Sequence, residues 1–209
     1  MNFLEKYGLK ILLILFLIVS YSITAQTKKL LILGDSISAG YGIKKSENWV
    51  TILESNLNSS TDNQYIIINA SVSGDTTSGG VSRINKALDF HSPNYVLIEL
   101  GGNDALRGYP VTIIKNNLEE IIKSIVNRDA RPLLMQIKIP RNYGKRYVEA
   151  FEKIYEELSV NYQIPLLDFM LDDIAFDNSL MQADGIHPNR KAQPLIASKM
   201  EEMLIDLLK

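Results

Sequence analysis

Five short apolar runs recur along the chain, and each has the pattern of a strand that is buried on both faces. They cover residues 29–34, 65–69, 95–100, 132–137 and, more weakly, 165–167. A continuous apolar run of this length, without alternating polar positions, is typical of strands in a parallel sheet that other elements cover on both sides.

Four other segments have apolar residues at helical spacing. They lie around residues 49–57, 113–125, 148–158 and 195–207. Strands that alternate with helices predict right-handed crossovers and a parallel sheet with helices on both faces, which is the α/β class. The sequence has no internal repeat, low-complexity tract or linker, so we expect a single domain over residues 26–209.

The first 25 residues have the pattern of a secretory signal peptide. Lys6 and Lys10 precede an apolar run over residues 11–19, and small and polar residues follow it up to Ala25. We therefore expect cleavage after Ala25 and a mature protein in the periplasm or outside the cell, without a stable membrane span. An uncleaved anchor is the alternative, although the uncharged run is somewhat short for a bilayer span, which needs about 20 residues.

The composition excludes several classes of protein. The 209-residue chain has 46% hydrophobic and 22% charged residues, which argues against intrinsic disorder and against a multi-span membrane protein. Its 22 basic and 24 acidic residues give a formal charge of −2, so it has no basic excess for binding nucleic acid. Cysteine is absent, which rules out disulfides, thiol catalysis and cysteine-ligated metal sites.

Candidate chemistry lies in four segments rich in small and polar residues. They are residues 34–42, 69–76 and 101–104, each directly after a predicted strand, and residues 184–188 before the last helix. Ligand sites in open parallel sheets lie beyond the carboxyl ends of the strands. Small residues there allow backbone N–H groups to approach a ligand closely. We therefore expect the four segments to meet at one edge of the sheet.

Ser36 follows the first strand and opens a helix, so its hydroxyl can face solvent. A serine needs a neighbouring base to become a nucleophile, and a histidine can take that role near neutral pH. His187 has Asp184 close by in a tight turn, which completes the arrangement of a Ser–His–Asp triad. The N–H groups of Ser36 and Gly74 and the side-chain amide of Asn103 would then form an oxyanion hole.

These segments resemble the four signature blocks of the SGNH (GDSL-type) hydrolases, and they occur in the same order. The blocks are Gly-Asp-Ser-Ile-Ser at 34–38, Gly74, Gly-Gly-Asn-Asp at 101–104 and Asp-Gly-Ile-His-Pro at 184–188. Leu-Leu-Met-Gln-Ile at 133–137 and Arg-Asn-Tyr-Gly at 141–144 extend the similarity to the thioesterase/lysophospholipase/arylesterase branch.

The resemblance covers nearly the whole mature chain and implies a flavodoxin-like, three-layer α/β/α sandwich of about five parallel strands. It implies a serine esterase without a metal or cofactor, in which Ser36 is the nucleophile, His187 the base and Asp184 its partner. Gly74 and Asn103 would be oxyanion donors alongside Ser36.

Together these features predict an exported serine hydrolase that cleaves ester or thioester bonds of acyl substrates, such as lysophospholipids and aryl or acyl esters. We expect a monomer that binds no nucleic acid. In relatives the loop after the Asn covers the acyl chain, which makes Leu106, Tyr109 and Pro110 candidate substrate contacts within a loop over residues 104–110. One alternative is an O-acetyl esterase for carbohydrates or cell walls. Another is a non-catalytic module that binds an anion at its Gly-rich first loop.

Several of these residues also have a purely structural interpretation. Ser36 could cap a helix, Asn103 could brace loops, and Gly74 could simply permit a turn with positive φ. We expect Asp35 to hydrogen-bond its own loops and His91 to lie on the surface in a turn. The basic residues that follow the fourth predicted strand form either a solvated cluster or a guide for an anionic head group: Arg141, Lys145 and Arg146.

Overall fold

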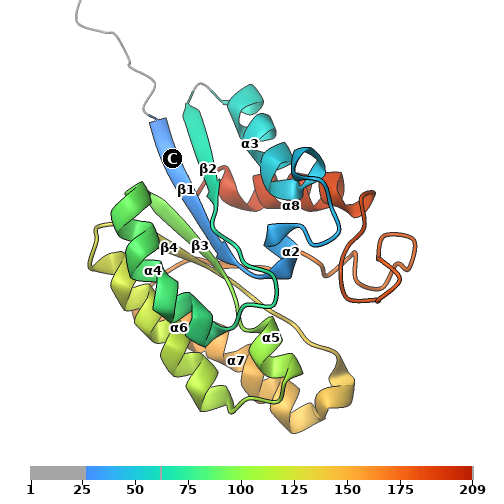
Figure 1. Cartoon of the computed structure of the whole chain (residues 1–209). Helices are drawn as coiled ribbons and strands as arrows, with labels where there is room; N and C mark the ends of the chain where they lie inside the picture. The colour runs from blue at the N-terminus through green and yellow to red at the C-terminus, as the bar shows by residue number, and fades with distance from the viewer. Residues whose placement is uncertain (1–26, 62, 209) are drawn as a thin grey trace, which may run out of the picture.

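The computed structural model describes residues 27–61 and 63–208, and its centre is a five-stranded parallel sheet (Figure 1). Every neighbouring pair of strands runs parallel. The strand order β2-β1-β3-β4-β5 is the flavodoxin-like one. The strands are β1 (Thr27–Gly34), β2 (Gln64–Asn69), β3 (Tyr95–Glu99), β4 (Arg131–Met135) and β5 (Leu166–Leu167).

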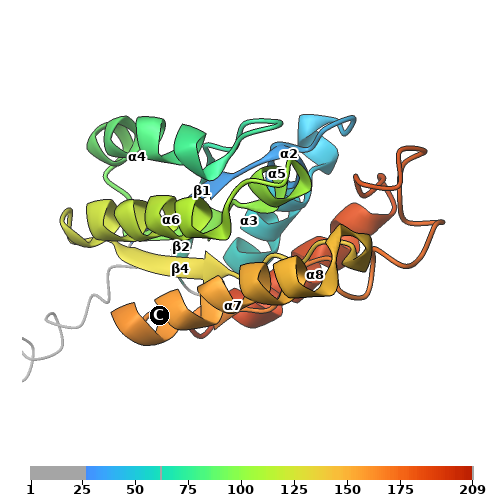
Figure 2. The same cartoon turned by 90° about the horizontal axis from the view of Figure 1, so that it is seen from below.

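Helices cover both faces of this sheet, as the alternation of strands and helices predicts. Three long helices follow one another across the molecule in Figures 1 and 2: α4 (Thr77–His91), α6 (Val111–Val126) and α7 (Lys145–Tyr162). Two others lie side by side: α3 (Trp49–Ser60) and α8 (Ala192–Leu204). The strand β3 is wholly buried between the two layers, as are the last five residues of β1 and the last four of β4. The fold class is therefore the predicted three-layer sandwich.

The helix α4 was not predicted by the spacing of apolar residues. Its first turns contain Gly79 and Gly80, which disfavour a helix, and only Ile84 and Leu88 contribute large buried apolar side chains. Gly80 has a packing reason, because a Cβ there would lie 2.5 Å from Leu100 Cδ1. The helix α4 therefore approaches the sheet closely at Gly80, and the same glycine makes the helix harder to predict from the sequence.

Short elements occupy the carboxyl edge of the sheet. The helix α2 (Ser36–Ala39) follows β1 directly, and α5 (Gly102–Leu106) follows β3. Two 3₁₀ turns, η1 (Lys45–Glu47) and η2 (Arg141–Tyr143), lie in the connections before α3 and α7. Because β1 and β3 are neighbours whose outgoing connections lead to opposite sides, their ends form the crevice where such sheets bind ligands.

Within residues 27–61 and 63–208, no helix is long and apolar enough to span a membrane. The predicted signal peptide, residues 1–25, lies outside the described residues.

Candidate active site

The turn after β1 presents Ser36 at the start of α2. Asp35, rather than Ser36, caps this helix, because Asp35 Oδ1 accepts a hydrogen bond from the Ile37 N–H at 3.0 Å. Ser36 is the first residue of the helix, so its own N–H has no acceptor within the helix. The structural interpretation of Ser36 as a cap is therefore wrong, and its hydroxyl and amide are both available for chemistry.

A short hairpin-like loop carries His187 to Ser36. Met181 and Pro188 form an antiparallel bridge, and the Gln182 N–H donates to the His187 carbonyl at 2.7 Å. The Gln182 side-chain amide also donates to the Tyr41 carbonyl at 2.8 Å, which ties this loop to the segment after α2. The Tyr41 ring packs on the imidazole with 4.5 Å between ring centroids. These contacts fix the orientation of the imidazole.

Three side chains form a hydrogen-bonded relay. His187 Nε2 lies 2.9 Å from Ser36 Oγ, and His187 Nδ1 lies 2.7 Å from Asp184 Oδ2. Asp184 Oδ1 accepts the N–H groups of His187 and Ile186 at 3.0 and 2.9 Å. The backbone bond from His187, its side-chain bond and the Ile186 N–H together lower the pKa of Asp184 to about 2. Asp184 is therefore ionised at neutral pH.

The two further oxyanion candidates are Gly74, in the segment between β2 and α4, and Asn103, in the helix α5. Gly74 has φ +77° and lies in a turn that is closed by a hydrogen bond from the Asp75 N–H to the Val72 carbonyl at 3.1 Å. The predicted turn with positive φ is therefore present at Gly74. Asn103, in α5, donates one Nδ2–H to Asp35 Oδ2 at 3.0 Å. Asn103 thus does brace the turn that carries Ser36, and an amide nitrogen carries a second hydrogen that this bond does not use.

Two carboxylates are buried at the turn that carries Ser36: Asp35, which hydrogen-bonds its own loops as expected, and Glu99, which was not predicted from the sequence. Glu99 Oε2 accepts the Ser38 hydroxyl at 2.6 Å and the Asp35 N–H at 3.2 Å. Burial raises the pKa of Glu99 well above its usual range, and the nearby Asp35 charge adds to this. Burial likewise raises the pKa of Asp35 to about 6, against the hydrogen bonds from Ile37 and Asn103. A charged residue inside the apolar run 95–100 was the available signal for Glu99.

A third buried carboxylate joins two of the loops. Asp104 is fully buried, and its two oxygens accept the N–H and the hydroxyl of Thr77 at 2.9 and 2.6 Å. Thr77 is the first residue of α4. This pair fixes the start of α4, and with it the Gly74 turn, against the helix that carries Asn103.

Comparison with known proteins identifies the family of this chain. The model of the GDSL-like Lipase/Acylhydrolase family matches residues 32–193. The chain belongs to this family.

Individual relatives are similar over most of their length. The chain is 44% identical over 194 residues to "Thioesterase 1/protease 1/lysophospholipase L1" of Escherichia coli strain K12, covering 93% of this chain and 91% of that one. It is 42% identical over 193 residues to an arylesterase of Vibrio mimicus, covering 92% and 96%. The solved structure of the psychrotrophic esterase EstA from Pseudoalteromonas sp., inhibited by monoethylphosphonate, matches with a TM-score of 0.84 at 40% identity, covering 87% and 98%. The protein is an ester-hydrolysing enzyme, which excludes the non-catalytic binding module.

The predicted acyl-covering loop of the enzyme is only partly a loop. Residues 102–106 form α5, so Leu106 ends a helix and is half-buried, while Tyr109 and Pro110 are exposed. The Tyr147 hydroxyl donates to the Tyr109 carbonyl at 2.6 Å, which attaches this segment to α7. The expectation of a continuous loop over residues 104–110 is therefore wrong, because the turn after β3 continues into helix.

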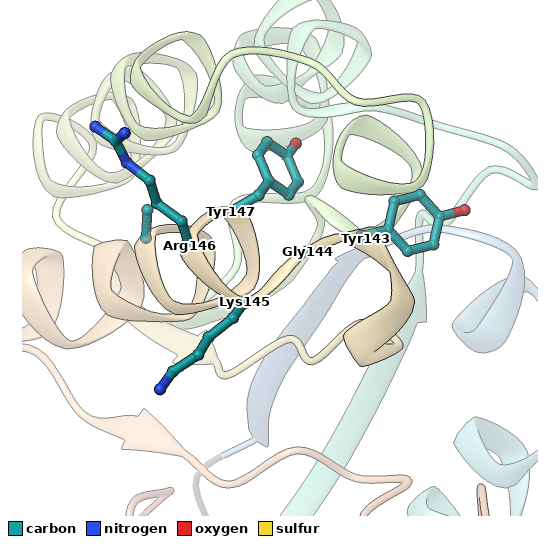
Figure 3. Close-up of a pocket in the computed structure, with 6 residues that line it drawn as sticks. Tyr143, Gly144, Lys145, Arg146 and Tyr147 are labelled. Atoms are coloured by element: carbon teal, nitrogen blue, oxygen red, sulfur yellow. The ribbon is translucent and has the colours of Figure 1, made fainter.

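The basic cluster after β4 does not form a converging site. A shallow depression of about 510 Å³ lies at the start of α7, lined by Tyr143, Lys145, Arg146 and Tyr147 among others. Figure 3 shows the Lys145 and Arg146 side chains pointing away from one another. Lys145 Nζ instead lies 3.8 Å from Glu149 Oε1 on the same helix. This arrangement favours the solvated interpretation of the cluster.

His91 takes no part in the site. It is the last residue of α4 rather than part of a turn, it is half-buried, and its carbonyl accepts the Lys29 ammonium at 3.1 Å. Within residues 27–61 and 63–208, no three His, Asp or Glu side chains gather in a way that could hold a metal ion.

The raised pKa of Asp35 predicts a pH-dependent contribution to stability. Aspartate in an unfolded chain ionises near pH 4, whereas folded Asp35 ionises at about 6. Between these values the folded protein holds a proton that the unfolded chain has lost, so the free energy of unfolding falls as pH rises through this window. The expected size is about 2–3 kcal/mol.

Urea unfolding of wild type and Asp35→Asn, measured from pH 4 to neutrality, checks this expectation. Asp35→Asn removes the titration of Asp35 together with the part of the Glu99 shift that the Asp35 charge causes, so the difference between the two proteins reports Asp35 and its coupling to Glu99. The wild type should lose stability relative to the variant as pH rises to about 6. A difference that is independent of pH would contradict the raised pKa.

Proposed function

We propose that this enzyme is an exported serine hydrolase that cleaves carboxylic esters and thioesters of acyl substrates through Ser36, His187 and Asp184. The observation that carries the proposal is the continuous relay from Asp184 Oδ2 through the imidazole to Ser36 Oγ, with distances of 2.7 and 2.9 Å. Its members come from the first and the last of the four segments, and only the fold brings them together.

In the first step Ser36 Oγ attacks the acyl carbonyl carbon while its proton passes to His187 Nε2. The ionised Asp184 holds the Nδ1 proton of His187 and stabilises the imidazolium that forms. Because the pKa of Asp184 is lowered to about 2, this partner keeps its charge at neutral pH.

The tetrahedral intermediate carries a negative oxygen, for which three donors lie on the surrounding loops. They are the Ser36 N–H, the Gly74 N–H and the remaining Nδ2–H of Asn103. Asp35 supports this role, because its carboxylate accepts the first Nδ2–H at 3.0 Å and so restricts rotation of the amide. Loss of one such donor raises the barrier by about 2.7–4 kcal/mol in other hydrolases.

Collapse of the intermediate breaks the bond to the leaving group, which takes the proton from His187 Nε2 and departs as an alcohol or thiol. Water then attacks the acyl-enzyme with His187 again as base, and the acid is released with Ser36 restored. We further propose that Leu106, Tyr109 and Pro110 contact the acyl chain. The names of the relatives, a thioesterase/lysophospholipase and an arylesterase, support acyl esters and thioesters as the substrate class.

The triad proposal predicts a single covalent adduct with a fluorophosphonate. Intact mass and peptide mapping should find it on Ser36 in the wild type and find none in Ser36→Ala. His187→Ala should label slowly, and kcat should fall by on the order of 10⁴-fold or more in both variants because the members act as a unit. His91→Gln is the matched control, since it removes the other histidine and should retain activity.

Lack of an adduct in folded wild type, or labelling that persists in Ser36→Ala, would refute the triad. Assays on an octanoyl ester and on an acetylated sugar in the same proteins separate the acyl-chain hydrolase from the O-acetyl esterase.

Export is proposed from the basic, apolar and small-residue pattern of residues 1–25. A lysophospholipid or another acyl ester outside the cytoplasm then suits the enzyme better than acyl-CoA. The full-length gene product, expressed in a bacterial host and fractionated, should appear in the periplasm or medium with Gln26 as its first residue. Recovery in the membrane fraction with residues 1–25 attached would support the uncleaved anchor instead.

A further inference from the structure

Arg83, on the second turn of α4, contacts three separate acceptors with one guanidinium group. Its Nε donates to Asp75 Oδ2 at 2.7 Å, and its Nη2 donates to the Gly34 carbonyl at 3.2 Å. Its Nη1 donates to the Ala70 carbonyl. The Arg83 side chain is 23% exposed and that of Asp75 is 11% exposed, so the contacts are largely shielded from water.

These acceptors belong to the two loops that the reaction needs in register. Gly34 ends β1 and leads into the turn that carries Ser36, whereas Ala70 begins the segment after β2. Asp75 directly follows Gly74, the proposed oxyanion donor. One planar group therefore connects the backbone that carries the Ser36 hydroxyl with the backbone that carries the Gly74 amide.

The other supports of the Gly74 turn are the Thr77–Asp104 pair at the start of α4 and the backbone ladder along β1. The ladder along β1 continues after β2, with the Ala70 N–H bound to the Ile32 carbonyl and the Val72 N–H bound to the Gly34 carbonyl, at 3.0 and 3.1 Å. Beyond Val72 the chain leaves β1. Arg107 Nη2 donates to the Gly74 carbonyl at 3.1 Å, but this contact is exposed to solvent.

The helix start is also shaped around the Asp75 carboxylate. A Cβ on Gly79 would lie 1.8 Å from Asp75 Oδ1, so a side chain there would displace the carboxylate from Arg83. Gly79, like Gly80, thus has a structural reason, because it leaves room for the ion pair between Asp75 and Arg83.

We propose that Arg83 is a positioning residue that holds the Gly74 N–H in register with the Ser36 hydroxyl. The proposal rests on the oxyanion role assigned to Gly74 above. Arginine suits the task because its fork reaches three acceptors in one plane, whereas a lysine ammonium is a single flexible point charge.

The test compares Arg83→Lys with Arg128→Lys. Arg128 is a matched control, because its guanidinium likewise binds a carboxylate through Nε and a second acceptor through Nη1, with Nε on Asp89 Oδ1 at 2.7 Å and Nη1 on Asn85 Oδ1 at 2.8 Å. Neither partner of Arg128 belongs to a loop of the site. The steady-state assay uses an aryl ester, with the active fraction of each protein counted by fluorophosphonate titration.

Arg83→Lys should lower kcat per active site by about 10- to 100-fold, which is the range for misplacing one oxyanion donor. KM should stay within about twofold, because ground-state binding is not changed. The acid limb of the pH profile should also keep its position, since the His187–Ser36 contact is separate from Arg83. Arg128→Lys should leave all three unchanged. A kcat per active site equal to that of the wild type, even with lower thermal stability, would overturn the proposal.

The Gly74 amide proton supplies a direct readout by NMR of the phosphonylated protein. In wild type it should move downfield when the adduct forms on Ser36, and in Arg83→Lys this movement should be reduced. An equal movement in both proteins would refute the positioning role while leaving the oxyanion role intact. No adduct, or no movement in the wild type, would refute the proposed function itself.

If Arg83→Lys does not fold, Asp75→Asn decides the question, because it leaves Arg83 and its two backbone contacts in place. The variant should then show a smaller loss of kcat with unchanged KM, and wild-type kcat would overturn the proposal.

Discussion

The hydrogen bond between His187 Nε2 and Ser36 Oγ is the contact on which the site depends, and it joins residues 151 positions apart. Ser36 is fixed at the end of the first strand, whereas His187 comes from the segment before the last helix. The two can meet because the strand order places β1 inside the sheet and because α8 packs against α3 beside it. The reactive geometry is therefore a property of the whole sandwich.

Burial of carboxyl groups around the turn that carries Ser36 imposes a second constraint. Glu99, Asp35 and Asp104 lie in the interior, where an unpaired carboxylate is costly, and each is bound by donors from another loop. The hydrogen bonds that stabilise these groups also connect β1, β3, α4 and α5. Arg83 completes the set from the other side by binding the Gly34 and Ala70 carbonyls. The loops at the carboxyl edge are thus held by polar contacts, whereas the strands are held by apolar packing.

This division explains which features were predictable from the sequence. The apolar runs foretold the five strands and the helices α3, α6, α7 and α8, and the positions of the polar segments after them foretold where the site lies. The helix α4 was missed because Gly79 and Gly80 serve contacts with Asp75 and Leu100, which no local pattern reveals. The roles of Glu99 and Arg83 were missed for a related reason, since Glu99 binds Asp35 64 positions away and Arg83 binds the Gly34 carbonyl 49 positions away. The helix α5 was not predicted because the pair Gly101-Gly102 is typical of a loop. Gly101 does have a positive φ of +117°, but the helix begins at the next residue.

The location of the proton on the His187 imidazole tests the central claim most directly. Nitrogen-15 NMR at neutral pH can read it, and because the chain has only two histidines, a His91→Gln variant assigns the signals. The account predicts a proton on Nδ1, held by Asp184, and a bare Nε2 that accepts the Ser36 hydroxyl. A proton on Nε2 instead would contradict the account, because that nitrogen could not take the proton of Ser36.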